Sequence, residues 1–226
     1  MLTSLVFGFL LHSQAQSGPL LMIHPTMNRT HIVFQLADNL WSVPREGGEA
    51  SRLTNEAGAA FGPTFSPDGS RIAFTGDFDG RGSPYVIPAE GGTPHRLTPV
   101  PGIAVGWTAD GNSVLFRSRY RSDTNYFRLY TVPAGGGVPT ELPFPAANEG
   151  SFSPDGSQLA YVPGGPQQAW KRYRGGATLP IWIGRLSDST VTKVPRNNSN
   201  DRFPMWVGNR IYFISDRGGP FGLYSF

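Results

Sequence analysis

The sequence predicts an all-β protein, a β-propeller built from four-stranded antiparallel blades. Three observations support this prediction. Glycine (29) and proline (21) occur at nearly twice their usual frequency, and charged residues make up only 15% of the 226 residues. The motif FSPDG at residues 65–69 recurs along the chain. Short apolar segments separated by turn residues follow each copy, as in proteins made of many short strands. This composition excludes a disordered chain, a coiled coil and a helix bundle.

The repeat has a period typical of a propeller blade. The copies are FSPDG at 65–69, WTADG at 107–111, FSPDG at 152–156 and a degenerate WVGN at 206–209. Their aromatic first residues are 42, 45 and 54 residues apart. Propeller blades of four strands repeat at about 40–45 residues, whereas helical solenoids and leucine-rich repeats have other periods.

Each unit contains the same elements in the same order. An apolar strand follows each motif, with one in an earlier unit, at 32–34, 72–74, 114–116, 159–161 and 211–213. A second strand comes next, at 40–44, 85–88, 129–133, 181–183 and from 223 onward. Gly-Gly turns at 47–48, 91–92 and 136–137 lead to short closing strands at 52–54, 96–98 and 141–143. Since such a sheet cannot bury both of its faces alone, the units must stack on one another.

Counting these units gives about four and a half blades, with the fifth unit ending after Tyr224. A closed ring of six blades at this period needs more residues than the chain has. We therefore expect residues 18–226 to form part of an N-terminal propeller, a truncated one. Its blades should form an open arc, and the last strand would leave an unpaired edge.

The first residues are typical of an export signal. Residues 5–11 (LVFGFLL) form a short apolar run, and small side chains follow at Ser13, Ala15 and Ser17. We expect a signal peptide at residues 1–17 and a periplasmic or secreted protein, with no membrane contact after its removal. No Lys or Arg precedes the run, so a buried first strand or a misplaced start codon are the alternatives, and the protein would be cytoplasmic if the segment is not a working signal. The absence of cysteine suits export and leaves no disulfide framework.

The search for catalytic and metal-binding residues predicts none, and no cofactor. The chain has no Gly-x-Ser-x-Gly nucleophile elbow, and Ser151 and Ser153 flank a predicted blade turn. His24 and His31 lack the helical spacing of a zinc site. Residues 77–80 (DFDG) resemble the start of a calcium loop, but a proline occupies the twelfth position, where that loop needs Glu. A blade turn explains this segment.

One basic segment is a candidate contact site. Lys171, Arg172, Tyr173 and Arg174 lie within a long excursion between two strands, from Val162 to Leu179. Ordered long loops often carry contacts. Two interpretations stay open: the guanidinium groups hold a carboxylate of a peptide or a neighbouring domain, or the loop is merely solvated.

A second basic cluster could line the same face. It consists of Arg117, Arg119 and Arg121 around Tyr120, although alternation along one strand explains these residues more simply. The net charge is only +3 and no long Lys/Arg run occurs. Nucleic acid is therefore not an expected partner.

The sequence of the repeats resembles the propeller repeats of two families, the periplasmic protein TolB and the tricorn protease family. Two further segments distinguish them. Residues 170–176 (WKRYRGG) with 181–183 (IWI) resemble a stretch of the first tricorn propeller. Residues 205–217 (MWVGNRIYFISDR) resemble the next blade of that propeller. The resemblance extends from about residue 20 to the last residue.

The tricorn resemblance implies a large serine protease with a six-bladed propeller, then a seven-bladed one, then a catalytic half. This chain would be its non-catalytic first propeller, channelling or gating peptides. The partners implied are peptide substrates, its own downstream protease domains and, at full length, further copies. The family's catalytic residues lie in domains beyond Phe226, so none can be placed here. In archaeal tricorn an arginine pair between blades two and three holds the substrate carboxyl end. Here that loop, Pro99 to Val105, has no basic residue.

Two alternatives remain. A TolB-like periplasmic propeller would act as a protein-binding module, but TolB carries a small α/β domain before its propeller and only about 20 residues precede the first blade here. A prolyl-peptidase-type propeller would need a hydrolase domain, which the 226 residues do not contain.

Overall fold

The computed structural model describes residues 21–164 and 173–226. The predicted signal peptide at residues 1–17 lies outside the described residues, as do Lys171 and Arg172. Every regular element within the described residues is a β-strand, as predicted.

The strands form five antiparallel sheets, each built from consecutive strands. The first contains β1 (Ile23–Met27), β2 (His31–Leu36), β3 (Asn39–Pro44) and β4 (Ser51–Arg52). The second contains β5 (Ala59–Phe65), β6 (Arg71–Asp77), β7 (Ser83–Pro88) and β8 (His95–Arg96). The third contains β9 (Ile103–Trp107), β10 (Ser113–Ser118), β11 (Arg128–Pro133) and β12 (Thr140–Glu141). The fourth contains β13 (Glu149–Phe152), β14 (Gln158–Val162), β15 (Trp182–Arg185) and β16 (Val191–Lys193). The fifth contains β17 (Asp201–Val207), β18 (Arg210–Ser215) and β19 (Gly222–Ser225).

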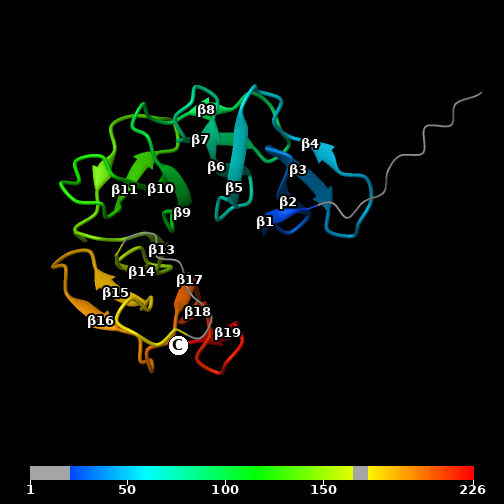
Figure 1. The fold of residues 1–226 in the computed structure, drawn as a ribbon. Helices are drawn as coiled ribbons and strands as arrows, with labels where there is room; N and C mark the ends of the chain where they lie inside the picture. Colours follow the sequence, from blue (N-terminus) through cyan, green and yellow to red (C-terminus); the bar gives the residue numbers. More distant parts are fainter. Residues whose placement is uncertain (1–20, 165–172) are drawn as a thin grey trace, which may run out of the picture.

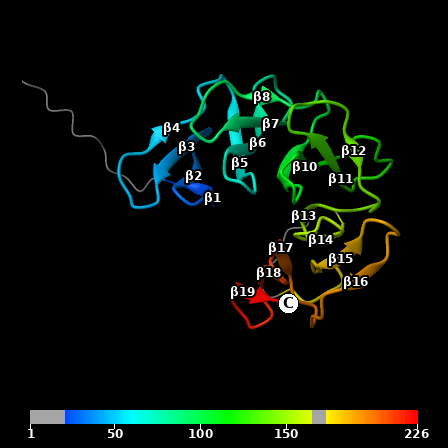
Figure 2. The same ribbon diagram turned by 180° about the vertical axis from the view of Figure 1, so that it is seen from behind.

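The sheets follow one another around an arc, as blades of a propeller (Figure 1). The first strand of each blade lies on the inner side and contacts the first strand of the next blade, from β1 through β5, β9 and β13 to β17. The last strands lie at the periphery. The same arrangement is seen from behind, with the first and fifth blades at the two ends of the arc (Figure 2).

The predicted blade count of about four and a half is wrong. The described residues form five blades, because β19 pairs with β18 along its whole length and makes the fifth sheet three-stranded. The sequence analysis also missed β16, the fourth strand of blade four. No Gly-Gly turn precedes β16. Instead, Asp188 Oδ1 accepts hydrogen bonds from the backbone N–H and the hydroxyl of Thr190, and the residue between them, Ser189, has a φ of 60°.

The aspartate of each repeated motif holds its turn. Asp68 accepts hydrogen bonds from Ser66 Oγ at 2.5 Å and from the Ser70 backbone N–H at 3.1 Å. Asp110 and Asp155 accept the equivalent bonds. The glycines that follow the aspartates have φ between 70° and 75°, a region that Gly adopts without a steric penalty. The recurring aspartates are therefore turn formers, as predicted.

Neighbouring blades share each hydrophobic cluster. Phe116 and Tyr130 of blade three pack with Ala73 and Val86 of blade two. In the same way, Phe213 of blade five packs in one cluster with residues of blade four. At each junction between two blades the facing sheet surfaces are thus buried, and the side chain of Phe116 is fully inaccessible to solvent.

Polar contacts join the motif turns of neighbouring blades. Asn28 Nδ2 donates to the carbonyl oxygen of Gly69 at 3.0 Å, and Arg71 Nη2 donates to that of Gly111 at 2.8 Å. The guanidinium of Arg71 also lies 5.0 Å from the ring centre of Trp107. The motif turns therefore lie at one end of the propeller. We call this end the turn face.

Phe116→Ala should destabilise the fold by about 3–5 kcal/mol, because it leaves a cavity between two blades. Urea denaturation followed by tryptophan fluorescence measures this change. Val138→Ala is the control, since Val138 is 85% exposed, and its effect should stay within about 0.5 kcal/mol. Equal effects of the two substitutions would contradict the inter-blade packing.

Acid should weaken the motif turns. The pKa of Asp155 is lowered to about 2, first by the hydrogen bond from Ser153 and then by those from Ser157. Its unfolded pKa is near 3.9. A depressed folded pKa contributes stability above the unfolded value, and this contribution is lost as pH falls from about 4 to about 2.

Asp155→Asn should therefore reduce the loss of thermal stability between pH 4 and pH 2 relative to the unmodified chain. Val138→Ala, at an exposed position without a titratable group, serves as the control and should leave that pH dependence unchanged. Thermal melting curves across this pH range measure the effect. Identical dependence of Tm on pH for the Asp155 variant and the unmodified chain would refute the stabilisation of the turn by the Asp155 carboxylate.

Candidate contact face

The long connections between strands lie at the end opposite the turn face. Antiparallel strands reverse direction at each turn, so the connection from β10 to β11 (119–127) and the described residues between β14 and β15 (163–164 and 173–181) share this end. The β18–β19 connection and the links between blades lie there too. We call this end the long-loop face.

Arg174 joins the long connection of blade four to blade five. Its Nη1 lies 2.7 Å from Asp216 Oδ2, and its Nη2 donates to the Asp216 carbonyl oxygen at 2.7 Å. The Asp216 side chain is only 3% exposed. It also accepts hydrogen bonds from the backbone and side-chain amides of Asn200. Burial raises the pKa of Asp216, but the bonds from Asn200 and Arg174 outweigh it and the pKa is lowered.

The predicted contact residues are thus only partly placed. Tyr173 and Arg174 lie on the long-loop face, whereas Lys171 and Arg172 lie outside the described residues. The Tyr173 hydroxyl accepts a long bond, 3.5 Å, from the backbone N–H of Ala177. The guanidinium of Arg174 does hold a carboxylate, and that carboxylate belongs to this chain. A contact of this segment with peptides or downstream domains stays a prediction.

A second buried carboxylate lies beside the first. Asp201 is fully buried and accepts hydrogen bonds from Ser199 Oγ at 2.8 Å and Ser215 Oγ at 2.6 Å. Arg217 Nη2 lies 3.0 Å from Asp201 Oδ2, and its guanidinium also stacks over Phe213. The sequence analysis did not single out Asp201, because nothing local marks it as the centre of a network.

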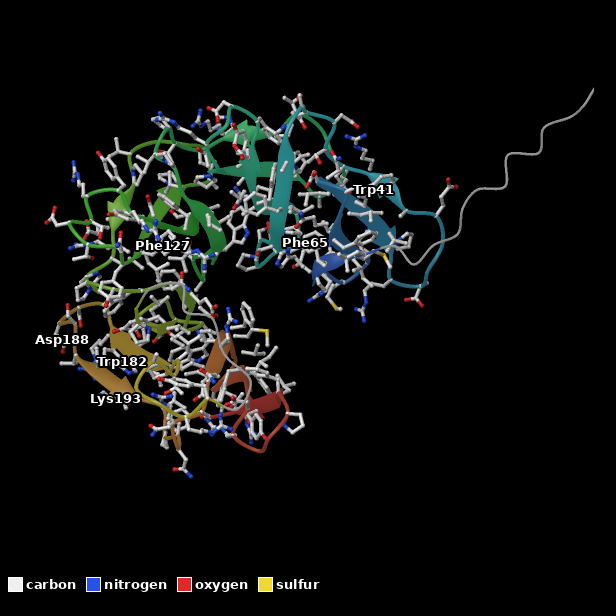
Figure 3. All side chains as sticks on the ribbon, in the orientation of Figure 1. Trp41, Phe65, Phe127, Trp182, Asp188 and Lys193 are labelled. Atoms are coloured by element: carbon white, nitrogen blue, oxygen red, sulfur yellow. The ribbon has the colours of Figure 1, made fainter. Side chains whose placement is uncertain are left out.

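The second basic cluster also lies at this face. Arg117 Nη1 donates to the side-chain and backbone oxygens of Asn148, at 2.9 and 3.2 Å. Arg117 and Arg119 lie 5.3 and 4.7 Å from the ring centre of Phe127, which is found where blades three and four meet (Figure 3). Arg119 and Arg121 lie beyond the end of β10, so alternation along the strand accounts only for Arg117.

The other residues considered in the sequence analysis form hydrogen bonds or ion pairs within the propeller. Ser151 Oγ accepts the backbone N–H of Trp206 at 2.9 Å, and Ser153 belongs to a motif turn. Residues 77–80 lie at the β6–β7 connection, where Asp79 pairs with Arg96 at 2.7 Å. Within the described ranges, no three acidic or histidine side chains are grouped as metal ligands, and no helix could cross a membrane.

Comparison with known proteins identifies the family. Residues 19–226 match the family model of the tricorn protease N-terminal β-propeller domain. The chain belongs to this family. It is 32% identical over 213 residues to tricorn protease homolog 1 of Streptomyces coelicolor, covering 92% of this chain and 20% of that protein. It is 26% identical over 219 residues to the tricorn protease of Thermoplasma acidophilum, with the same two coverages.

Solved structures agree with this fold. The crystal structure of the tricorn protease superposes with a TM-score of 0.76 at 25% identity, over 92% of this chain and 21% of that one. The structure of a putative TolB from Agrobacterium tumefaciens superposes with a TM-score of 0.73 at 21% identity, over 92% of this chain and 76% of that one. The chain therefore spans about a fifth of the length of its tricorn relatives.

Arg174→Ala should destabilise the chain by about 1–3 kcal/mol, because a buried carboxylate loses a charge-assisted partner. Arg185→Ala removes a similar pair whose two side chains are 58% and 44% exposed, so it should cost less than about 0.5 kcal/mol. Urea titration of both variants tests this, and an Arg174 variant as stable as the control would show that the inter-blade pair contributes nothing.

Proposed function

We propose that this chain acts as the non-catalytic N-terminal propeller of a tricorn-type serine protease and channels or gates peptides toward catalytic domains. Family membership over residues 19–226 is the observation that carries the proposal. The geometry supports it, because the inner strands face the concave side of the arc, and the blade-three connection and the described part of the blade-four connection lie at the same end of the blades. That end is suited to contact a peptide or another domain.

We further propose that the full ring has six blades. The outer face of blade five exposes apolar side chains on two strands, among them Met205, Val207 and Leu223. In the other blades the equivalent face packs on the next sheet. A further blade would cover this face in the same way. Downstream protease domains, additional copies of the chain and export to the periplasm or beyond belong to the same proposal.

A TolB-like protein-binding module is the second candidate. The TolB likeness of the fold favours it, and a TolB homolog of Chlorobium luteolum is 29% identical over 129 residues. That match covers 54% of this chain, whereas the tricorn homolog of Streptomyces covers 92%. The tricorn function is therefore preferred.

Peptide binding by the purified chain tests the channelling role. A pool of capped decapeptides of mixed composition should bind with a Kd within about 1 mM, the usual range for enzyme substrates, and should keep its mass on incubation. Calorimetry measures the binding and mass spectrometry the peptide integrity. Absence of binding at millimolar peptide would contradict the channelling role, and hydrolysis would contradict a non-catalytic propeller.

A further inference from the structure

A strained residue marks one point of the inner strand of blade five. Phe203 has a φ of 53° and precedes Pro204. The left-handed region is rare for bulky residues, and a following proline disfavours helical conformations further. The pairing of β17 with β18 shifts at this point, so Phe203 lies in a bulge. Its side chain is 51% exposed, so burial of the ring does not explain why a bulky residue occupies the position.

The same bulge recurs in two other blades with different side chains. Blade two has Gly62 before a proline, with a φ of 63°, and blade one has His24 before a proline, with a φ of 51°. A Cβ built on Gly62 meets no atom within 4 Å, although blade three follows it. His24 is exposed although blade two follows it. The exposure of Phe203 is therefore a property of the bulge and does not depend on a missing neighbour.

The backbone of Phe203 is tied to a buried carboxylate at the long-loop face. Its N–H donates to Glu149 Oε2 at 2.7 Å. Arg202 Nη2 lies 3.4 Å from Glu149 Oε1, and the guanidinium of Arg202 lies 4.8 Å from the Phe203 ring centre. Arg117 lies beside the same carboxylate, because its Nη1 donates to the backbone and side-chain oxygens of Asn148, the residue before Glu149.

Positive charge exceeds negative charge around this point. Among the described residues, Arg202 pairs with Glu149 whereas Arg117 has no carboxylate as an ion-pair partner, and the Nε atoms of both arginines have no hydrogen-bond partner. Arg119 adds a third guanidinium, stacked with Arg117 on Phe127. Guanidinium groups prefer planar carboxylates as partners. An exposed aromatic ring beside them favours an apolar neighbour of that carboxylate.

We propose that Phe203, with Arg202, Arg117 and Arg119, forms a subsite that binds an acidic side chain of a peptide together with an adjacent apolar residue. The inference rests on the proposed peptide-channelling function and names a substrate class for it. The surplus guanidinium charge holds the carboxylate, and Phe203 covers the apolar neighbour.

Two doubly capped peptides test the subsite, acetyl-Gly-Phe-Glu-Leu-Gly-amide and its counterpart with Gln in place of Glu. The Glu peptide should bind at least about tenfold more tightly, as expected for one charge-assisted contact. A third probe, the Gln peptide with a free carboxyl end, separates a side-chain carboxylate from a terminal one. Equal binding of the Glu and Gln peptides, or tight binding of the third probe alone, overturns the subsite.

Phe203→Gly gives the decisive variant. It should weaken Glu-peptide binding about tenfold while leaving Tm unchanged or higher, because glycine suits a positive φ. His24→Gly is the matched control at the equivalent bulge of blade one and should leave binding unchanged. Arg119→Gln should also weaken binding, whereas Arg45→Gln on the turn face should not.

These outcomes separate the subsite from the proposed function. Peptide binding that persists in all four variants overturns the subsite and leaves the channelling role standing. Failure of the unmodified chain to bind either capped peptide or the decapeptide pool removes both. A loss of binding shared by Phe203→Gly and His24→Gly also overturns the subsite, since it would report a general effect of the bulges.

Discussion

The packing of each sheet against its neighbours is the constraint on which the rest of the structure depends. A short four-stranded sheet has two faces and too few residues to bury either within itself. Each hydrophobic cluster accordingly draws side chains from two blades, as Phe116 does with Val86 and Phe213 with Val162. The repeat period, the tight motif turns and the inward position of the first strands all serve this stacking.

The two ends of the propeller meet this constraint differently. At the turn face, local hydrogen bonds within each motif fix nearly identical turns, and a few polar contacts join them. At the long-loop face, buried carboxylates of Glu149, Asp201 and Asp216 join residues distant in sequence. Because these contacts do not repeat from blade to blade, this face can vary without disturbing the stacked sheets. Functional contacts are expected where such variation is tolerated.

The sequence predicted what depends on local chemistry. Pro-Asp-Gly turns and alternating apolar triplets predicted the strands and their period, because both signals lie within a few residues of one another. The partner of Arg174 could not be predicted, since Asp216 lies 42 residues away. The strand β16 was missed because an Asp-Ser turn replaces the Gly-Gly turn. The bulge at Phe203 left a visible signal, a residue before proline at the same place in three blades, but only the backbone shows its positive φ.

Hydrogen–deuterium exchange of the chain with and without the capped Glu peptide tests the central claim most directly, namely that the long-loop face near the inner strands is the contact face. We expect slower exchange at residues 117–127 and 201–206 when the peptide is bound, because bound peptide restricts local opening. The motif turns at 66–71, 108–113 and 153–158 should be unaffected. Protection confined to those turns, or no protection at saturating peptide, would contradict the account.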